Sequence, residues 1–303
     1  MGIGDVFAVE NSDAIHYVDT GMFDTAQYGS VYLVDADEPA LVDTGMGTHH
    51  DRVLDAMDAV GIDPAELRHV LLTHVHLDHA GGAGYLLEAC PNATAYCHEI
   101  GVRHLVSPER LVAGTKAAVE DQWQYYADPV PVPEDRIEGL SDGDRVDLGD
   151  RSVEVVHAPG HAPHQVLYHD EGDDVLFTGD AAGIYVSARD EVVQTSPPAN
   201  FDLEQCLADV RTIQDRAPER ICFGHFGDRR YERTVMDGYK RTLVEWVEAI
   251  RRVREREPDD EAVIQHFVEH ADVRGVWGDE KAEAETRLNV RGVLGYLDRR
   301  AEK

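Results

Sequence analysis

The stretch of seven residues from Thr73 to His79 has the composition of a metal-binding loop. Neutral imidazole nitrogens and carboxylate oxygens are the ligands that zinc and similar divalent metals take in proteins. The spacing therefore predicts a metal site, and the alternative interpretation is a histidine-rich surface loop. The four candidate ligands in the stretch are His74, His76, Asp78 and His79.

This stretch is expected to lie on a loop between a strand and a helix. An apolar run at 69–72 predicts a short buried strand before it, and the apolar pattern at 85–89 predicts a helix after it. Loops of this kind let side chains converge. Alternate residues of an extended loop face the same side, so we expect the first three candidate ligands to face one side and His79 the other.

Three further residues of ligand type follow later strands in the chain. His161, Asp180 and His225 each come shortly after an apolar run and directly after a glycine. Four strand ends that deliver His or Asp in this order form a specific constellation. The three apolar runs that predict these strands lie at 153–156, 175–177 and 220–223.

Five short motifs in this order resemble the motifs of the metallo-β-lactamase superfamily, over roughly residues 14 to 227. The resemblance implies an α+β fold, the four-layer αββα sandwich of that superfamily, as a catalytic domain over 1–227. It also implies that the substrate is a small molecule. The five motifs are Val42–Gly45, Thr73–His79, Pro159–His161, Thr178–Asp180 and Gly224–His225.

The resemblance also assigns the metal ligands. It implies two divalent metal ions, with Zn²⁺ the first choice and iron or manganese the alternatives. Asp180 would bridge the two ions, and Asp78 would be both a ligand and the residue that orients the attacking nucleophile. The first ion would be held by His74, His76 and His161, and the second by Asp78, His79 and His225.

Other residues are candidates for roles beside the metals. The resemblance implies that Asp43 supports the ligand loops, which fits the general need to orient metal ligands. His164 and Tyr185 are candidates for contact with substrate or with the ligands, and a packing role is the alternative for each. The family places a flap over the site at 19–29 and a variable helical insert at 108–126.

Residues 228–303 differ in composition from the rest of the chain. Apolar residues recur at helical spacing at 239–256, 263–268 and 290–297, with charged residues between them. These patterns predict a C-terminal helical region that packs on the catalytic domain or in a homodimer.

The chain is strongly acidic, with a formal net charge of -31 and 43% hydrophobic residues. The charges are spread along its length, which favours adaptation to high salt, as in proteins of halophiles, over one acidic interaction surface. Such a surface argues against nucleic acid as a partner. No leader pattern and no apolar run of about 18 residues is present, so we expect a cytoplasmic protein with no membrane span.

Hydrolysis of a thioester, a lactone or a similar carbonyl ester is the first functional hypothesis. Two metals about 4 Å apart can share a water molecule and bring its pKa toward ~7, so that a bridging hydroxide attacks the carbonyl carbon. The chain resembles the glyoxalase-II-like and lactonase-like branch most. No basic cluster is recognisable for the carboxylates of glutathione, which disfavours a glutathione thioester.

Three alternatives remain at this point. A phosphodiesterase or nuclease of the same superfamily would use the same ligands, although the acidic composition argues against it. A persulfide dioxygenase uses fewer metal ligands than this chain offers. A non-enzymatic binding protein is the third, and the complete ligand set argues against that one.

Overall fold

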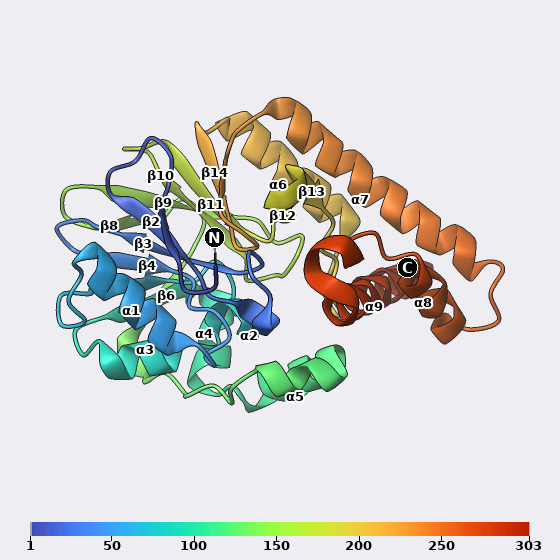
Figure 1. Cartoon of the computed structure of the whole chain (residues 1–303), viewed down its shortest axis with the longest axis horizontal. Coiled ribbons are helices and arrows are strands. Elements are labelled where there is room, and N and C mark those ends of the chain that lie inside the picture. Colours follow the sequence, from blue (N-terminus) through green and yellow to red (C-terminus); the bar gives the residue numbers. More distant parts are fainter. Residues whose placement is uncertain (1, 303) are drawn as a thin grey trace.

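Two β-sheets lie face to face in the computed structural model, which describes residues 2–302 (Figure 1). The first sheet is antiparallel through its first four strands and parallel through the rest. Across this sheet the order is β1 (Val6–Ala8), β2 (Ile15–Asp19), β3 (Ser30–Val34), β4 (Ala40–Val42), β5 (His69–Leu71), β6 (Thr94–His98) and β7 (Ile137–Leu140).

The second sheet is antiparallel except for one parallel pair, β11 with β14. It contains all three strands that the sequence predicts after residue 150. Across the sheet the order is β15 (Asp228–Arg230), β14 (Arg220–Phe223), β11 (Val175–Gly179), β10 (Val166–Asp170), β9 (Ser152–His157) and β8 (Arg145–Asp147). A separate hairpin pairs β12 (Ile184–Val186) with β13 (Glu191–Val193).

Alternation along the strands divides the apolar residues between two faces of each sheet. In β3, Val31 and Leu33 face an outer core, whereas Tyr32 and Val34 face the core between the sheets. Both faces are buried, so the strand is almost continuously apolar. This pattern explains the two-sheet sandwich.

Helices cover the outer face of each sheet (Figure 1). Helices α1 (His50–Val60) and α3 (Ala83–Ala89) pack on the first sheet, and α6 (Leu203–Arg216) and α7 (Arg233–Arg254) pack on the second. The layers are therefore helix, sheet, sheet and helix. This confirms the four-layer sandwich.

The C-terminal helices share a core with the second sheet. Side chains of α7, α8 (Asp260–Glu269) and α9 (Arg274–Ala301) belong to the same apolar cluster as Leu167 of β10 and Ile221 of β14. Helix α9 is much longer than the apolar pattern at 290–297. Strand β15, just beyond residue 227, also joins the second sheet.

The insert at 108–126 is helical, as predicted. Helix α4 (Glu99–Val106) precedes it, and α5 (Glu109–Val119) runs into a 3₁₀ turn at Glu120–Tyr125. Helix α5 lies below the sandwich in Figure 1, and α9 lies to the right of the sandwich. No helix among residues 2–302 combines the length and apolar character needed to span a membrane. All four cysteines are buried free thiols.

Candidate metal centre

The first ligand group consists of three buried or half-buried histidines at one edge of the sandwich. His74 follows β5, and His161 follows β9. The Nδ1 atom of His76 lies 3.1 Å from Nε2 of His74 and 3.1 Å from Nε2 of His161. These three nitrogens face one another closely enough to ligate one ion. The structure thus brings together the three residues predicted for the first metal.

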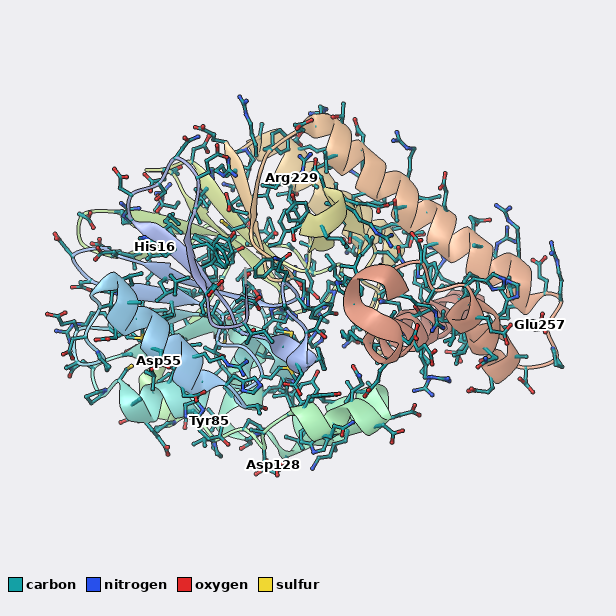
Figure 2. The ribbon with its side chains drawn as sticks, viewed as in Figure 1. His16, Asp55, Tyr85, Asp128, Arg229 and Glu257 are labelled. Atoms are coloured by element: carbon teal, nitrogen blue, oxygen red, sulfur yellow. The ribbon has the colours of Figure 1, made fainter. Side chains whose placement is uncertain are left out.

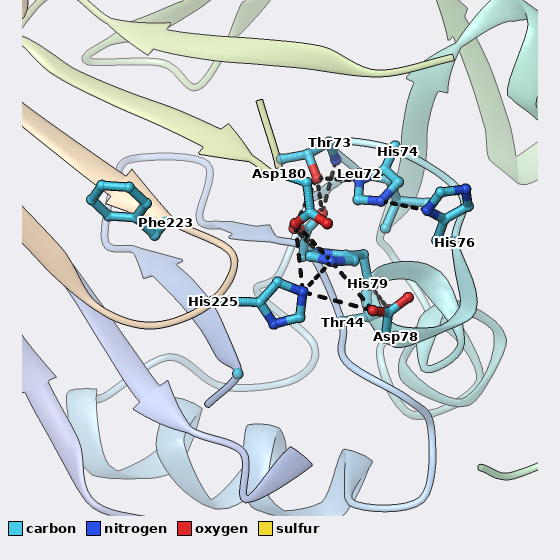
Figure 3. A network of polar contacts seen from close by, with 12 residues as sticks. Thr44, Leu72, Thr73, His74, His76, Asp78, His79, Asp180, Phe223 and His225 are labelled. Carbon is cyan, nitrogen blue, oxygen red and sulfur yellow. Dashed lines mark hydrogen bonds and ion pairs between the residues drawn. The ribbon is translucent and has the colours of Figure 1, made fainter. Parts of the chain in front are cut away.

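The second group joins the short helix α2 (Leu77–Ala80) to the loop after β14 (Figure 3). The Nε2 atoms of His79 and His225 are 3.3 Å apart. Asp78 Oδ2 lies 3.7 Å from each of these nitrogens. This set matches the one predicted for the second metal.

Asp180 lies between the two groups, at the end of β11. Its Oδ1 atom is 3.2 Å from His79 Nε2, and its Oδ2 atom is 3.3 Å from His161 Nε2. The side chain is only 4% exposed, and Oδ1 has no hydrogen-bond partner among the described residues. A buried carboxylate oxygen without a hydrogen bond, beside imidazole nitrogens, fits a metal ligand.

Burial and charge give the histidines different protonation states. Burial lowers the pKa of His74 well below its usual value and lowers that of His161 to about 3, so both are neutral, as ligands must be. Burial also acts to lower the pKa of His79, but the carboxylates of Asp180 and Asp78 raise it well above its usual value. The second group therefore favours a positive charge, which a metal ion would supply.

Asp43 orients two of the histidines from the end of β4. Its carboxylate accepts hydrogen bonds from the backbone N–H of Thr73 at 2.8 Å and from His79 Nδ1 at 2.9 Å. The Thr73 hydroxyl donates to the same carboxylate at 2.9 Å, which leaves its oxygen free to accept from His74 Nδ1 at 3.1 Å. Both imidazoles then turn Nε2 toward the metal groups. The predicted supporting position of Asp43 agrees with this geometry.

His225 is oriented by a residue that the sequence did not single out. Its Nδ1 atom donates to the backbone oxygen of Tyr28 at 3.0 Å. The Tyr28 hydroxyl donates to Glu285 of α9 at 2.6 Å, and Lys281 Nζ lies 2.8 Å from the same carboxylate. The C-terminal helix thereby reaches the second group. The chain has only four lysines, and that scarcity is the one sequence feature that marks Lys281.

The predicted alternation along the ligand loop is wrong at Asp78. The backbone is extended at His76, but a helical turn begins at Leu77. Consecutive residues of a helical turn point about 100° apart rather than to opposite sides, so Asp78 can lie with His79 and not with His74.

The other two candidates differ in their placement. His164 lines the cavity beside the metal groups, with its ring centroid 5.6 Å from that of His76. Tyr185 is not among the cavity-lining residues: its ring stacks on Phe223, and its hydroxyl donates to Asp190 at 3.0 Å. The Tyr185 hydroxyl therefore binds Asp190 in this structure, and its contact with substrate or ligands stays a prediction. Its backbone N–H instead donates to the His225 carbonyl.

A cavity of about 1260 Å³ opens over both ligand groups. Helix α5 forms one wall and α9 another. Met22 and Phe23 from the predicted flap are both buried in one apolar cluster, and Phe23 also lines the cavity. This volume exceeds that of a typical small-molecule site and admits an elongated substrate.

Comparisons with known proteins agree with this geometry. An acyl-coenzyme A thioesterase from Bos taurus, MBLAC2, is 24% identical over 73% of this chain and 81% of its own length. An N-acyl homoserine lactonase from Bacillus thuringiensis is 26% identical over 64% of this chain and 79% of its own length. The crystal structure of the archaeal protein ST1585 from Sulfolobus tokodaii superposes with a TM-score of 0.68 at 21% identity, covering 93% of this chain and 99% of that one.

The sequence model of the metallo-beta-lactamase superfamily matches residues 24–225. That segment contains both sheets apart from strands β1, β2 and β15, and it contains every residue of the two ligand groups. The chain therefore belongs to the metallo-beta-lactamase superfamily and is a metal-dependent hydrolase.

Proposed function

We propose that this chain hydrolyses a thioester, a lactone or another carbonyl ester of a small molecule with the help of two divalent metal ions. The position of Asp180 carries the proposal, because each of its carboxylate oxygens faces one ligand group. A single ion would need no such shared ligand. Five of the seven ligands are histidines, which favours zinc over iron or manganese.

Asp78 is the proposed catalytic residue. The ions, when bound, would lower the pKa of a water molecule and stabilise negative charge on the substrate oxygen. The Asp78 side chain is 23% exposed, against 4% for Asp180, so it is accessible from the cavity. From there its carboxylate can accept a hydrogen bond from the attacking water and orient it.

His164 is the proposed hydrogen-bond donor to the substrate. Its Nδ1 atom accepts the backbone N–H of Val75 at 3.3 Å, which places the proton of the neutral ring on Nε2. Burial lowers the pKa of His164 to about 2 and keeps the ring neutral. Nε2 has no hydrogen-bond partner among residues 2–302, and the residue lines the cavity. Its N–H can therefore donate to the carbonyl oxygen or to the leaving group.

The named relatives support a carbonyl substrate over a phosphodiester. One is named as a thioesterase and another as a lactonase, and each aligns over more than three quarters of its own length. The net charge of -31 also argues against polyanionic substrates such as nucleic acid.

We also propose that the acidic surface is an adaptation to high salt. Carboxylates project from elements all around the molecule, with Asp55, Asp128 and Glu257 at well-separated places (Figure 2). A charge spread in this way is screened in concentrated salt and repels itself in dilute buffer.

The proposed function is tested by comparing initial rates on a thioester, a lactone and a chromogenic phosphodiester, with metal content measured in parallel. Asp180→Asn should abolish carbonyl hydrolysis and reduce the metal content from about two ions toward one. Asp215→Asn, at an exposed position of α6, is the matched control. Faster cleavage of the phosphodiester would replace the carbonyl assignment. Full metal content and activity in Asp180→Asn would overturn the shared-ligand site.

A further inference from the structure

Two arginines on one wall of the cavity have no ion-pair partner within residues 2–302. Arg103 of α4 and Arg110 of α5 both line the cavity. The hydrogen bond found for Arg103 runs from its Nε to His104 Nε2, at 3.3 Å. Among residues 2–302, neither guanidinium lies within ion-pair distance of a carboxylate, and none of the hydrogen bonds involves the Arg110 side chain. Both groups are therefore available to a ligand.

The other cations of the cavity wall are already neutralised. Lys281 pairs with Glu285 at 2.8 Å, and Arg287 pairs with Glu261 at 2.8 Å. Two wall carboxylates are also paired, since Glu120 lies 2.8 Å from Arg291 and Glu283 lies 2.6 Å from Arg274. Asp121 and Glu280 are the wall carboxylates outside the metal groups that form no ion pair within the described chain. They belong to the 3₁₀ turn after α5 and to α9, whereas the free arginines belong to α4 and the start of α5.

The positive charges of both arginines act on the His104 ring. Burial lowers the pKa of His104, and the two guanidinium groups lower it further. Both charged groups that act on this ring are cations. In a chain of net charge -31, this part of the cavity wall differs from its surroundings because it is positively charged.

The positively charged part of the cavity wall lies beside the first ligand group. The His104 ring centroid lies 6.2 Å from that of His164, and the His164 centroid lies 5.6 Å from that of His76. His104 and His164 thus connect the arginines to the first ligand group along one side of the cavity. A substrate whose carbonyl lies at the metal groups can reach the arginines with its other end.

We propose that Arg103 and Arg110 bind an anionic group, a carboxylate or a phosphate, at the end of the substrate remote from the scissile carbonyl. A guanidinium presents a planar fork of donors that matches both anions and can bind them through two parallel hydrogen bonds. With this subsite, the proposed substrate class narrows from carbonyl esters in general to acyl compounds that carry a negative charge. This inference rests on the proposed function only for the identity of the reacting carbonyl group.

The test uses three thioesters of similar length: a neutral butanoyl thioester, a succinyl thioester with a free carboxylate, and a thioester of a phosphorylated thiol. We expect Arg103→Ala/Arg110→Ala to lose kcat/KM on the charged thioesters by about tenfold more than on the neutral one. Arg103→Lys/Arg110→Lys keeps the positive charges but not the planar forks of donors. Its loss of kcat/KM on the charged thioesters should lie between that of the double alanine variant and that of the unaltered protein. Arg211→Ala, at an exposed position of α6, should behave like the unaltered protein. The charged thioester that suffers the larger loss identifies the anion.

An equal loss on neutral and charged thioesters, or no loss at all, would overturn the anion subsite and leave the hydrolase assignment intact. A binding measurement tests the anion subsite in the case in which the hydrolase assignment fails. Thioether analogues of the same three compounds, which cannot be hydrolysed, are titrated calorimetrically into the metal-loaded protein. Tighter binding of a charged analogue, lost in the double alanine variant, would support the subsite even if no thioester is cleaved. Equal binding of all three analogues would rule it out.

Discussion

The Tyr28 hydroxyl donates a 2.6 Å hydrogen bond to Glu285 Oε2, across 257 positions of sequence. Tyr28 also accepts a hydrogen bond from the metal-group residue His225 through its backbone oxygen. Glu285 further accepts from Lys281, whose ammonium lies 3.7 Å from the ring centroid of Phe23. The C-terminal helix α9 is therefore part of the site and not only a cover for the second sheet.

Removing the Glu285 carboxylate should destabilise the fold and loosen the second ligand group. Lys281 is 6% exposed, so Glu285→Ala would leave a buried ammonium unpaired, at a cost of about 3–5 kcal/mol in the free energy of unfolding. Chelator competition should also show weaker binding of one metal ion, because Tyr28 loses its acceptor. Urea unfolding measures the stability.

Glu283→Ala on the same helix is the matched control for this prediction. Glu283 pairs with Arg274 at 2.6 Å but is 46% exposed, so its removal should cost less than about 1 kcal/mol. Similar losses for the two variants would mean that the buried Lys281–Glu285 pair has no special role.

Asp43→Asn should weaken metal binding more than it weakens the fold. An amide in place of the carboxylate cannot accept from Thr73 and His79 at once without turning its NH₂ toward a donor. We expect a loss of metal affinity of about 10–100-fold, as for other residues that orient metal ligands. Competition with a chromogenic chelator gives the affinity, and Asp37→Asn at an exposed position is the control. Unchanged affinity would contradict the orienting role.

Substitutions of His164 should separate hydrogen bonding from packing. His164→Phe removes the proposed donor and should lower kcat/KM by about 10²-fold or more with metal content unchanged. His164→Gln can place an N–H near the position of Nε2 and should recover part of that loss. If both variants lose activity equally and also lose metal, His164 supports the ligands and does not contact substrate.

The free energy of unfolding should fall in mild acid because of His164. The folded-state pKa of His164 is lowered to about 2 by burial, whereas its pKa in the unfolded chain is near 6.5. Between these values, unfolding takes up a proton, so each pH unit below 6.5 should cost about 1.4 kcal/mol for this residue.

His164→Gln should make the dependence of unfolding free energy on pH shallower by about one proton. The comparison uses both proteins stripped of metal by the same chelator, between pH 6.5 and 4.5, so that other titrating groups contribute equally. Parallel curves would show that His164 is not a buried neutral ring.

Salt should stabilise the fold if the acidic surface is an adaptation to it. Raising KCl from 0.1 to 1 M shortens the screening length from about 10 Å to about 3 Å and weakens repulsion among the carboxylates. The free energy of unfolding should rise over this range. Urea serves as denaturant because guanidinium chloride is itself a screening salt, and a flat or falling stability would exclude the adaptation.

The ligands were predictable from sequence because each follows an apolar strand in a short motif. His161, Asp180 and His225 could be grouped with the loop at 73–79 because each segment follows a predicted strand, and the resemblance to the superfamily implied how the ligands divide between two ions. The helical turn that regroups Asp78 was not predictable, because four residues contain too little periodicity to reveal a helix.

The walls of the cavity were much less predictable. The first half of α9 carries Lys281 and Glu285 among other charged residues, and a buried ion pair has the same sequence pattern as a solvated helix face. Arg103 and Arg110 lie seven positions apart on two different helices, so only the turn between α4 and α5 places them on one wall.

The position of Asp180 between the two groups has a thermodynamic consequence. A ligand shared by two ions makes their affinities interdependent, and reciprocity requires each ion to change the affinity of the other by the same factor. An ion that fixes the carboxylate helps its neighbour to bind, whereas the repulsion between the two positive charges opposes it. If two ions bind as proposed, this balance would set how much protein carries a single ion when metal is scarce, and hence whether activity disappears gradually or abruptly as metal is withdrawn.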